Sequence, residues 1–297
     1  MIADEAHRLT DKSGMYKNLG ENQVKEIINT AKFSIFFLDE SQRVTTSDIG
    51  SEDLIRKYAK ELGANVEMYE LESQFRCNGS DGYLAWIDNV LEIRETANYD
   101  IEGFNYDFEV FDDPNELRKA IIEKNNKNGK SRLLAGYCYE WKKESKNNPN
   151  MNDIVLPEYN FAMSWNLSSD NTFAISEGSI NQVGCIHTSQ GLEFDYAGVI
   201  IGKDLRYENG QIVTDFTKRA ASDKSMSGIK GMYKKDPEKA LKIADEIIKN
   251  TYRTLMTRGM KGCYVFCEDK ALANYLKLRS NTLSKEEVDL LVAEEND

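Results

Sequence analysis

The sequence predicts an α/β protein built on parallel β-sheets. Apolar stretches typical of buried strands alternate along the chain with amphipathic helical stretches, and this alternation implies a parallel sheet. The composition agrees, because 40% of the 297 residues are hydrophobic, 30% are charged and only 4 are proline. A chain of this length can bury one large core or two modest ones.

The first quarter of the chain shows the alternation clearly. Ser51 is a good N-cap for a helix whose first turn is acidic, and Gly63 is a typical helix end. The apolar run KFSIFFLDE predicts a buried strand that ends in carboxylates. In order, we expect a short strand at residues 1–3, a helix at 22–32, a strand at 32–40, a helix at 51–62 and a strand at 65–71.

The remainder continues the pattern. Glu208-Asn209-Gly210 indicates a hairpin turn, followed by a mobile loop through Lys235. The acidic end after Asn281 predicts a short helix or a tail. The other expected elements are helices at 80–95, 114–125, 237–257 and 270–278, strands at 108–111, 131–141, 182–187, 196–202 and 262–267, and a polar loop at 142–152.

Composition also restricts the class of protein. No run approaches 18 apolar residues and no cationic-then-apolar leader opens the chain, so we expect no membrane contact and a cytoplasmic location. The five cysteines are scattered, which fits a reduced compartment. Cys263 and Cys267 bracket the apolar run YVF without a nearby histidine, so we interpret them as buried strand residues rather than metal ligands.

The net charge of −12 and the pI near 4.9 count against a self-sufficient nucleic-acid binder, which usually has a basic face. A binding groove whose basic wall lies on another domain remains compatible with this charge.

Two segments near the start place carboxylates after apolar runs, as phosphoryl transfer requires. In IADEAHRL, Asp4 is a candidate Mg²⁺ ligand and Glu5 a candidate for orienting the attacking water. In FFLDESQRV, Asp39 and Gln42 are suited to sensing a γ-phosphate. Acidic residues also open helices routinely, so helix capping is the alternative interpretation of both segments.

Two later segments supply further candidates. In VGCIHTSQGLEFDYAGVII, His187 and Thr188 can face a phosphate, Gly191 permits close backbone approach, and Glu193 can accept bonds from a ribose or an arginine. In NTYRTLMTRGMKGCYVF, Arg258 is a candidate arginine finger. A cation at a helix end also offsets the helix dipole, which is the alternative role for Arg258.

Taken in order, these segments resemble the motif series of superfamily 1 helicases. The match is carried by Asp4 to His7 (motif II), Leu38 to Gln42 (motif III), Gln74 and Arg76 (motif IV), His187 to Asp195 (motif V) and Thr257-Arg258 (motif VI). The wording of motifs V and VI, together with the run AGYCYEW that precedes them, is most similar to one family. This is the Schlafen group 3-like DNA/RNA helicase domain family of bacterial proteins, for which ATP binding is predicted. The resemblance covers residues 1 to about 280.

The resemblance implies RecA-like sheets of the P-loop NTPase type. Residues 1–70 would be the residual part of a first RecA-like domain and residues 71–297 a complete second one. ATP and Mg²⁺ would be the cofactors, with Arg76 and Arg258 reaching the γ-phosphate, and single-stranded DNA or RNA would be the partner. Trp86, Trp141 and Trp165 are stacking candidates, although core packing is the alternative for each.

The sequence departs from the family pattern in three places. Leu38 stands where motif III usually begins with glycine, and motif IV has Ser-Gln-Phe-Arg instead of a glutamine three residues before the arginine. No G-x-x-x-x-G-K-[ST] occurs anywhere. We therefore expect a fragment of a longer protein that lacks an N-terminal RecA-like segment, with weak or absent ATP binding and hydrolysis of its own. A non-catalytic helicase-like module that binds nucleic acid or a protein is the alternative, and a metal-dependent nuclease is a third class.

Overall fold

The chain divides into two compact units. A computed structural model describes residues 1–13, 19–70, 77, 80–101, 103, 105–167, 172–189 and 193–280. Unit 1 consists of residues 1–72 and 224–251, and unit 2 of residues 73–223 and 252–297. The sequence led us to expect domains at 1–70 and 71–297, whereas the structure adds 224–251 to the first unit. That the two units correspond to the residual part of a first RecA-like domain and to a complete second one stays a prediction.

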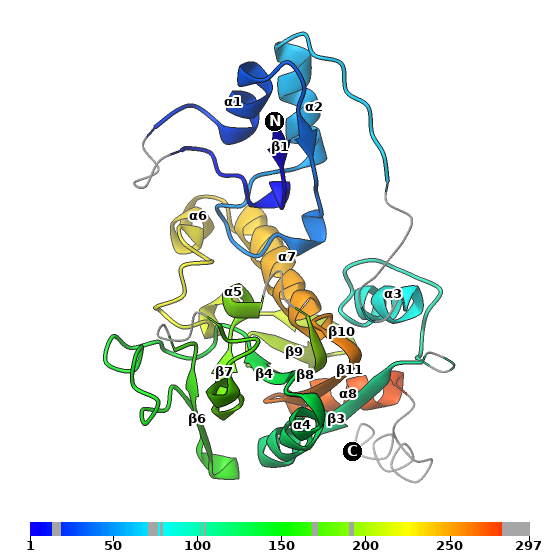
Figure 1. Cartoon of the computed structure of the whole chain (residues 1–297), viewed down its shortest axis with the longest axis vertical. Helices are drawn as coiled ribbons and strands as arrows, with labels where there is room; N and C mark the ends of the chain where they lie inside the picture. Colours follow the sequence, from blue (N-terminus) through cyan, green and yellow to red (C-terminus); the bar gives the residue numbers. More distant parts are fainter. Residues whose placement is uncertain are drawn as a thin grey trace. The chain divides into compact units, whose positions relative to one another are not determined.

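Unit 2 is built on a seven-stranded sheet with the order β3-β11-β8-β4-β7-β6-β5 (Figure 1). All neighbouring strands are parallel except the antiparallel pair β5–β6. The structure therefore confirms an α/β fold with a mostly parallel sheet. The strands are β3 (Asp107–Phe111), β4 (Ser131–Ala135), β5 (Ile154–Leu156), β6 (Phe161–Trp165), β7 (Gln182–Gly184), β8 (Phe194–Ile201) and β11 (Gly259–Cys267).

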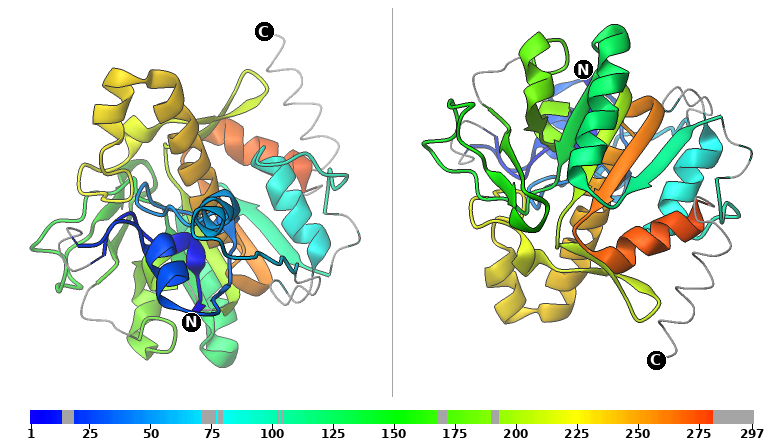
Figure 2. Two further views of the ribbon diagram at one scale, coloured as in Figure 1. Left: turned by 90° about the horizontal axis from the view of Figure 1, so that it is seen from above. Right: turned by 90° about the horizontal axis from the view of Figure 1, so that it is seen from below.

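Helices cover both faces of this sheet, as the alternation along β3 shows. Asp107 accepts a hydrogen bond of 2.9 Å from Lys124 of α4 (Pro114–Asn128), so α4 lies on one face (Figure 2). Phe108 points the other way and its ring packs 4.9 Å from Trp86 of α3 (Asp81–Val90). Trp86 Nε1 also donates to the carbonyl of Arg279, which places α8 (Lys270–Arg279) on the α3 face.

A β-hairpin stands beside the main sheet of unit 2. Strands β9 (Leu205–Glu208) and β10 (Gln211–Thr214) pair antiparallel and are joined by Asn209-Gly210. Both turn residues have positive φ, 52° and 80°, as a tight two-residue hairpin turn requires. The sequence prediction of this hairpin is therefore confirmed.

Among its described residues, unit 1 contains a small parallel sheet, four α-helices and two short 3₁₀ helices. Strands β1 (Ile2–Ala3) and β2 (Ile35–Phe36) pair parallel. Helix α1 (Gln23–Thr30) is capped by Asn22, and helix α2 (Glu52–Glu61) by Ser51. Helices α6 (Ile229–Lys235) and α7 (Pro237–Met256) come later in the chain, and the unit boundary falls within α7.

Several predicted elements differ from the structure. The buried strand expected at 32–40 pairs only over Ile35–Phe36, and Phe33 and Phe37 on either side of it are exposed. The strand expected at 65–71 is absent from the described residues 65–70, where no strand pairs with them and Met68 and Tyr69 are exposed. The mobile loop expected up to Lys235 contains helix α6, because Gly228 turns the chain into it. The strand expected at 182–187 ends at Gly184, and α5 (Ile186–Ser189) follows. The strand expected at 131–141 ends at Ala135.

Within the described part of the chain, no helix combines the length and the apolar character needed to cross a membrane.

Candidate functional site

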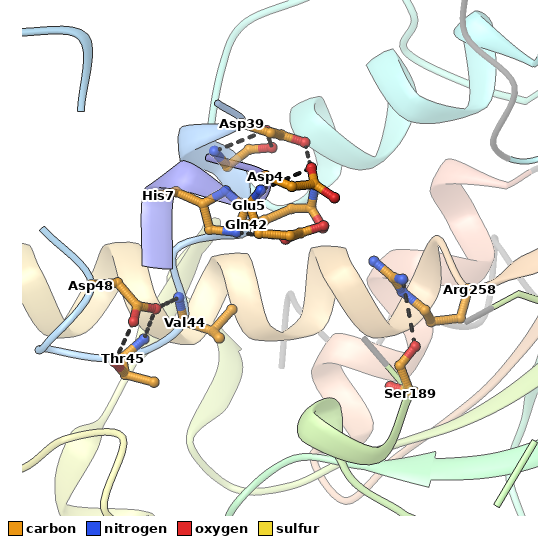
Figure 3. A network of polar contacts seen from close by, with 11 residues as sticks. Asp4, Glu5, His7, Asp39, Gln42, Val44, Thr45, Asp48, Ser189 and Arg258 are labelled. Atoms are coloured by element: carbon orange, nitrogen blue, oxygen red, sulfur yellow. Dashed lines mark hydrogen bonds and ion pairs between the residues drawn. The ribbon is translucent and has the colours of Figure 1, made fainter. Parts of the chain in front are cut away.

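The pairing of β1 with β2 brings two predicted motif segments together in unit 1. Ala3 lies opposite Phe36 in the parallel register, and Phe37 N donates to the carbonyl of Ala3 over 2.9 Å. Both strands end at the same edge, so the segments that begin at Asp4 and Asp39 leave the sheet side by side (Figure 3). The carboxyl ends of parallel strands are where open α/β sheets bind ligands.

Asp4 and Glu5 have different environments although they are adjacent. Asp4 is exposed, and its Oδ1 accepts a hydrogen bond of 2.9 Å from the backbone N of Glu5. Glu5 adopts a left-handed conformation with φ 51° and ψ 43°. That conformation costs a non-glycine residue about 1–2 kcal/mol, and such residues are concentrated at functional sites.

His7 is packed beneath Glu5. Its side chain is 1% exposed and its Nε2 lies 3.0 Å from Glu5 Oε2, without the alignment of a hydrogen bond. Neither ring nitrogen has a hydrogen-bond partner among the described residues. Burial lowers the pKa of His7, and the nearby carboxylates of Glu5, Asp39 and Asp48 offset only part of this effect. His7 is therefore neutral at pH 7.

Asp39 organises the segment after β2. Its carboxylate caps the short 3₁₀ helix at residues 40–42 by accepting from Ser41 N at 3.1 Å and Ser41 Oγ at 2.5 Å. The other oxygen accepts from Gln42 Nε2 at 2.7 Å. The capping interpretation and the sensing interpretation are therefore compatible, because the cap itself holds the Gln42 amide in place.

A residue that the sequence analysis missed, Asp48, holds the next loop. The buried carboxylate accepts hydrogen bonds from Val44 N and Thr45 N, each at 3.1 Å, and from Thr45 Oγ1 at 2.8 Å. Two residues later, Gly50 packs so closely on the motif II backbone that a Cβ there would lie 1.8 Å from the carbonyl oxygen of Ala6. The cluster of turn residues in Thr-Thr-Ser-Asp was the available signal.

The carboxylates of unit 1 fit a magnesium ion that is shared with a nucleotide. No group of three or more His, Cys, Asp or Glu side chains forms a metal site within the described residues. Magnesium in nucleotide sites, however, needs only one or two protein carboxylates in addition to phosphate oxygens. The exposed Asp4 suits the ion. Glu5 Oε2, which is buried beside His7 Nε2 and accepts no hydrogen bond within the described residues, suits a water molecule.

In unit 2, Arg258 is joined to the segment that contains His187 and Glu193. Its side chain is buried, with Nε donating to the carbonyl of Thr254 at 3.1 Å and Nη1 to that of Ser189 at 3.5 Å (Figure 3). The Arg258 carbonyl accepts from Phe194 N at 2.9 Å. Arg258 thus contacts Ser189 at the end of α5 and Phe194 at the start of β8, and its guanidinium lies against the α7 terminus and α5.

His187 and Glu193 are both exposed. The His187 ring lies on α5 and its centroid is 5.8 Å from that of Tyr137. Thr188 fixes the start of α5, because its hydroxyl accepts from Cys185 N at 2.8 Å. Glu193 directly precedes β8, at the opposite end of that strand from the loop that follows Ile201.

Three predicted site residues, Gln74, Arg76 and Gly191, lie outside the described residues. Among the tryptophans, Trp86 and Trp165 are core residues with 0% and 2% exposure. Trp141 is half-buried beneath the ammonium group of Lys146, which lies 4.0 Å from its ring centroid. Cys263 and Cys267 are buried in β11, as predicted.

Comparison with known proteins identifies the family of this chain. Residues 1–269 match the family model described as Schlafen group 3, DNA/RNA helicase domain. An uncharacterized protein of Saccharomyces cerevisiae, YPL245W, is 27% identical over 298 residues, which cover 93% of this chain and 64% of the yeast protein. The chain therefore belongs to the Schlafen group 3 DNA/RNA helicase domain family.

Proposed function

We propose that this chain forms part of the ATP-hydrolysing site of a superfamily 1 helicase-like, nucleic-acid-dependent ATPase with RecA-like lobes. The observation that carries the proposal is the parallel β1–β2 pair, which delivers Asp4, Glu5, Asp39 and Gln42 to one sheet edge. Membership of a helicase-domain family supports the same assignment.

Each residue of unit 1 has a separate role in the proposal. Asp4 would hold Mg²⁺, which when bound neutralises charge on the phosphates. Glu5 Oε2, buried and free of hydrogen bonds within the described residues, would accept a hydrogen bond from the attacking water. Asp39 holds the Gln42 amide at 2.7 Å, so that Gln42 is oriented before the γ-phosphate arrives.

Residues of unit 2 would supply the cations and further nucleotide contacts. We assign Arg258 and Arg76 to the γ-phosphate, and Gln74, His187, Gly191 and Glu193 to nucleotide binding. Arg258 now donates to two backbone carbonyls through Nε and Nη1, with the longer bond at 3.5 Å. Its use as an arginine finger would require the guanidinium to exchange the carbonyl of Ser189 for phosphate oxygens.

The sequence holds no P-loop, so we propose that the phosphate-binding lysine and the second Mg²⁺-binding group come from residues outside these 297. The chain alone should hydrolyse ATP negligibly. The test compares this chain with a longer natural version that carries a P-loop, each in the presence of single-stranded DNA or RNA.

In the longer protein, Arg258→Ala should lower the ATP hydrolysis rate by about 10³-fold or more, as loss of an arginine finger does. Arg94→Ala is the matched control, since the Arg94 side chain is 67% exposed and pairs with Asp88 of α3. Full turnover by the Arg258→Ala protein would defeat the arginine assignment.

A non-catalytic module that binds nucleic acid or a protein is the second candidate, favoured by the missing P-loop and the net charge of −12. Strand binding by the longer protein without any strand-stimulated ATP hydrolysis would select this alternative.

A further inference from the structure

Unit 1 carries a concentration of positive charge on residues 224–242, although the chain as a whole is acidic. Residues 224–242 contain six lysines and two carboxylates, which gives them a net charge of +4. The net charge of the whole chain is −12, so the other residues together carry −16. A local concentration of lysine on one segment is the electrostatic signature of a polyanion-binding surface. The six lysines are Lys224, Lys230, Lys234, Lys235, Lys239 and Lys242; we call them the lysine surface.

The lysine surface is open to solvent. All six side chains are exposed, whereas Ile229 of α6 and Ala240 of α7 are buried on the inner sides of these helices. The ion pairs of this stretch of unit 1 join other residues, such as Lys249 with Asp245, and none of the six pairs with a carboxylate of the described residues. Their charge is therefore free to act on a ligand.

The arrangement fits a nucleic-acid strand better than an acidic protein. Lys230 and Lys234 are four residues apart on α6 and so share one side of it, and Lys239 and Lys242 are three apart on α7. Tyr233, 42% exposed, lies among them on α6 and offers a ring for base stacking. Lysines interleaved with an exposed aromatic ring are suited to a backbone of phosphates with bases attached.

The same segment is bonded to the loop that follows Gln42. Ser225 O accepts from Thr46 N at 2.7 Å, and Ser227 O accepts from Thr46 Oγ1 at 2.9 Å. Arg43 Nη1 lies 3.3 Å from Glu246 Oε1 of α7, and Asn250 Nδ2 donates to the Arg43 carbonyl at 3.1 Å. A ligand on the lysine surface would therefore bind residues 224–242, and this segment is hydrogen-bonded to the loop that follows Gln42.

We propose that the lysine surface of α6 and the start of α7 binds the phosphate backbone of single-stranded nucleic acid. This deepens the proposed function by naming where unit 1 contacts the strand, and it rests on that function only for the link to ATP hydrolysis. Because the chain is acidic as a whole, a strand should approach unit 1 preferentially where the local charge is positive.

The test is strand binding by the 297-residue chain without nucleotide, measured by fluorescence anisotropy with labelled oligothymidylate and oligouridylate. The variant Lys234→Gln/Lys239→Gln is compared with the matched control Lys203→Gln/Lys218→Gln, whose lysines are exposed in unit 2 within a stretch of mixed charge. Both variants change the net charge equally, and thermal melting shows whether both remain folded.

If both lysines contact phosphates, the slope of log affinity against log salt should become shallower by ~1.4, which corresponds to an affinity loss of about 25-fold at 0.1 M salt. The control should bind like the wild type. Preference for one of the two oligonucleotides would identify DNA or RNA as the strand.

Equal losses in both variants would overturn the proposal, because the effect would then be one of total charge. Failure of the wild type to bind either strand, or equally tight binding of polyglutamate, would overturn it too. None of these outcomes depends on ATP hydrolysis, so this experiment tests strand binding independently of the proposed nucleotide site.

Discussion

The side-chain amide of Gln42 donates a hydrogen bond of 2.7 Å to the carboxylate of Asp39. Asp39 ends the strand segment and caps the 3₁₀ turn that carries Gln42, so one carboxylate fixes both the backbone and the side chain of the candidate sensor. In a protein that carries a P-loop, Gln42→Ala should leave ATP affinity nearly unchanged and lower the hydrolysis rate by about 10²-fold. Gln211→Ala, on the exposed hairpin strand β10, is the control. A parallel loss of ATP affinity would show that Gln42 binds nucleotide in the ground state instead.

Gly50→Ala should destabilise the protein. The added Cβ would lie 1.8 Å from the carbonyl oxygen of Ala6, and backbone on both sides must move to relieve the contact. We expect the free energy of unfolding to fall by about 1–3 kcal/mol or more. Gly231→Ala in α6 is the matched control, because nothing lies within 4 Å of its added Cβ and alanine favours helix by up to about 1 kcal/mol. Denaturant unfolding of both variants checks the difference.

His7 should titrate below the ordinary histidine range. Its pKa is lowered by burial, so the folded protein binds fewer protons at this site than the unfolded chain does. The free energy of unfolding should therefore be unaffected by His7 above pH ~6.5 and should fall as the pH drops below that value. The chain has only two histidines, so proton NMR of the wild type and of His187→Gln assigns both imidazole signals. A pKa for His7 at or above ~6.5 would contradict the described packing.

Asp204 and Arg219 form a buried ion pair in unit 2. Breaking it should lower the free energy of unfolding more than breaking an exposed ion pair does. Arg219 Nε donates to Asp204 at 2.9 Å, Tyr252 OH also donates to Asp204, and both charged side chains are at most 1% exposed. Asp204→Ala would leave the guanidinium buried with one partner fewer and should cost about 3–5 kcal/mol. Glu116→Ala breaks an exposed pair with Lys119 and should cost less than about 1 kcal/mol. Similar unfolding curves for the two variants would refute this ranking.

Local signals predicted much of the fold. The cap at Ser51, the Asn209-Gly210 turn and the apolar run of β11 each depend on residues close in sequence, and the structure has all three. Helix α6 was missed because its seven residues include Gly231 and begin after Gly228, and glycine argues against a helix unless packing decides otherwise. Packing does decide here, through buried Ile229.

The sequence was enough to predict which residue types form the candidate site. It was not enough to predict the backbone conformation and the contacts that hold those residues in place. Asp4, Glu5, Asp39 and Gln42 could be found because carboxylates and an amide follow apolar runs. The left-handed backbone of Glu5 and the burial of His7 depend on contacts between segments that local patterns do not encode. The same holds for Arg258, whose bond to Ser189 joins residues 69 positions apart.

The central claim is that Glu5 activates the attacking water at the β1–β2 edge. Its most direct test is the ATP hydrolysis rate of Glu5→Gln in a P-loop-containing version of the protein with single strands present, with Glu61→Gln on the exposed side of α2 as control. The account predicts a rate loss of about 10²–10⁴-fold, retained nucleotide binding and an unchanged control. Wild-type turnover by the Glu5→Gln protein would contradict it.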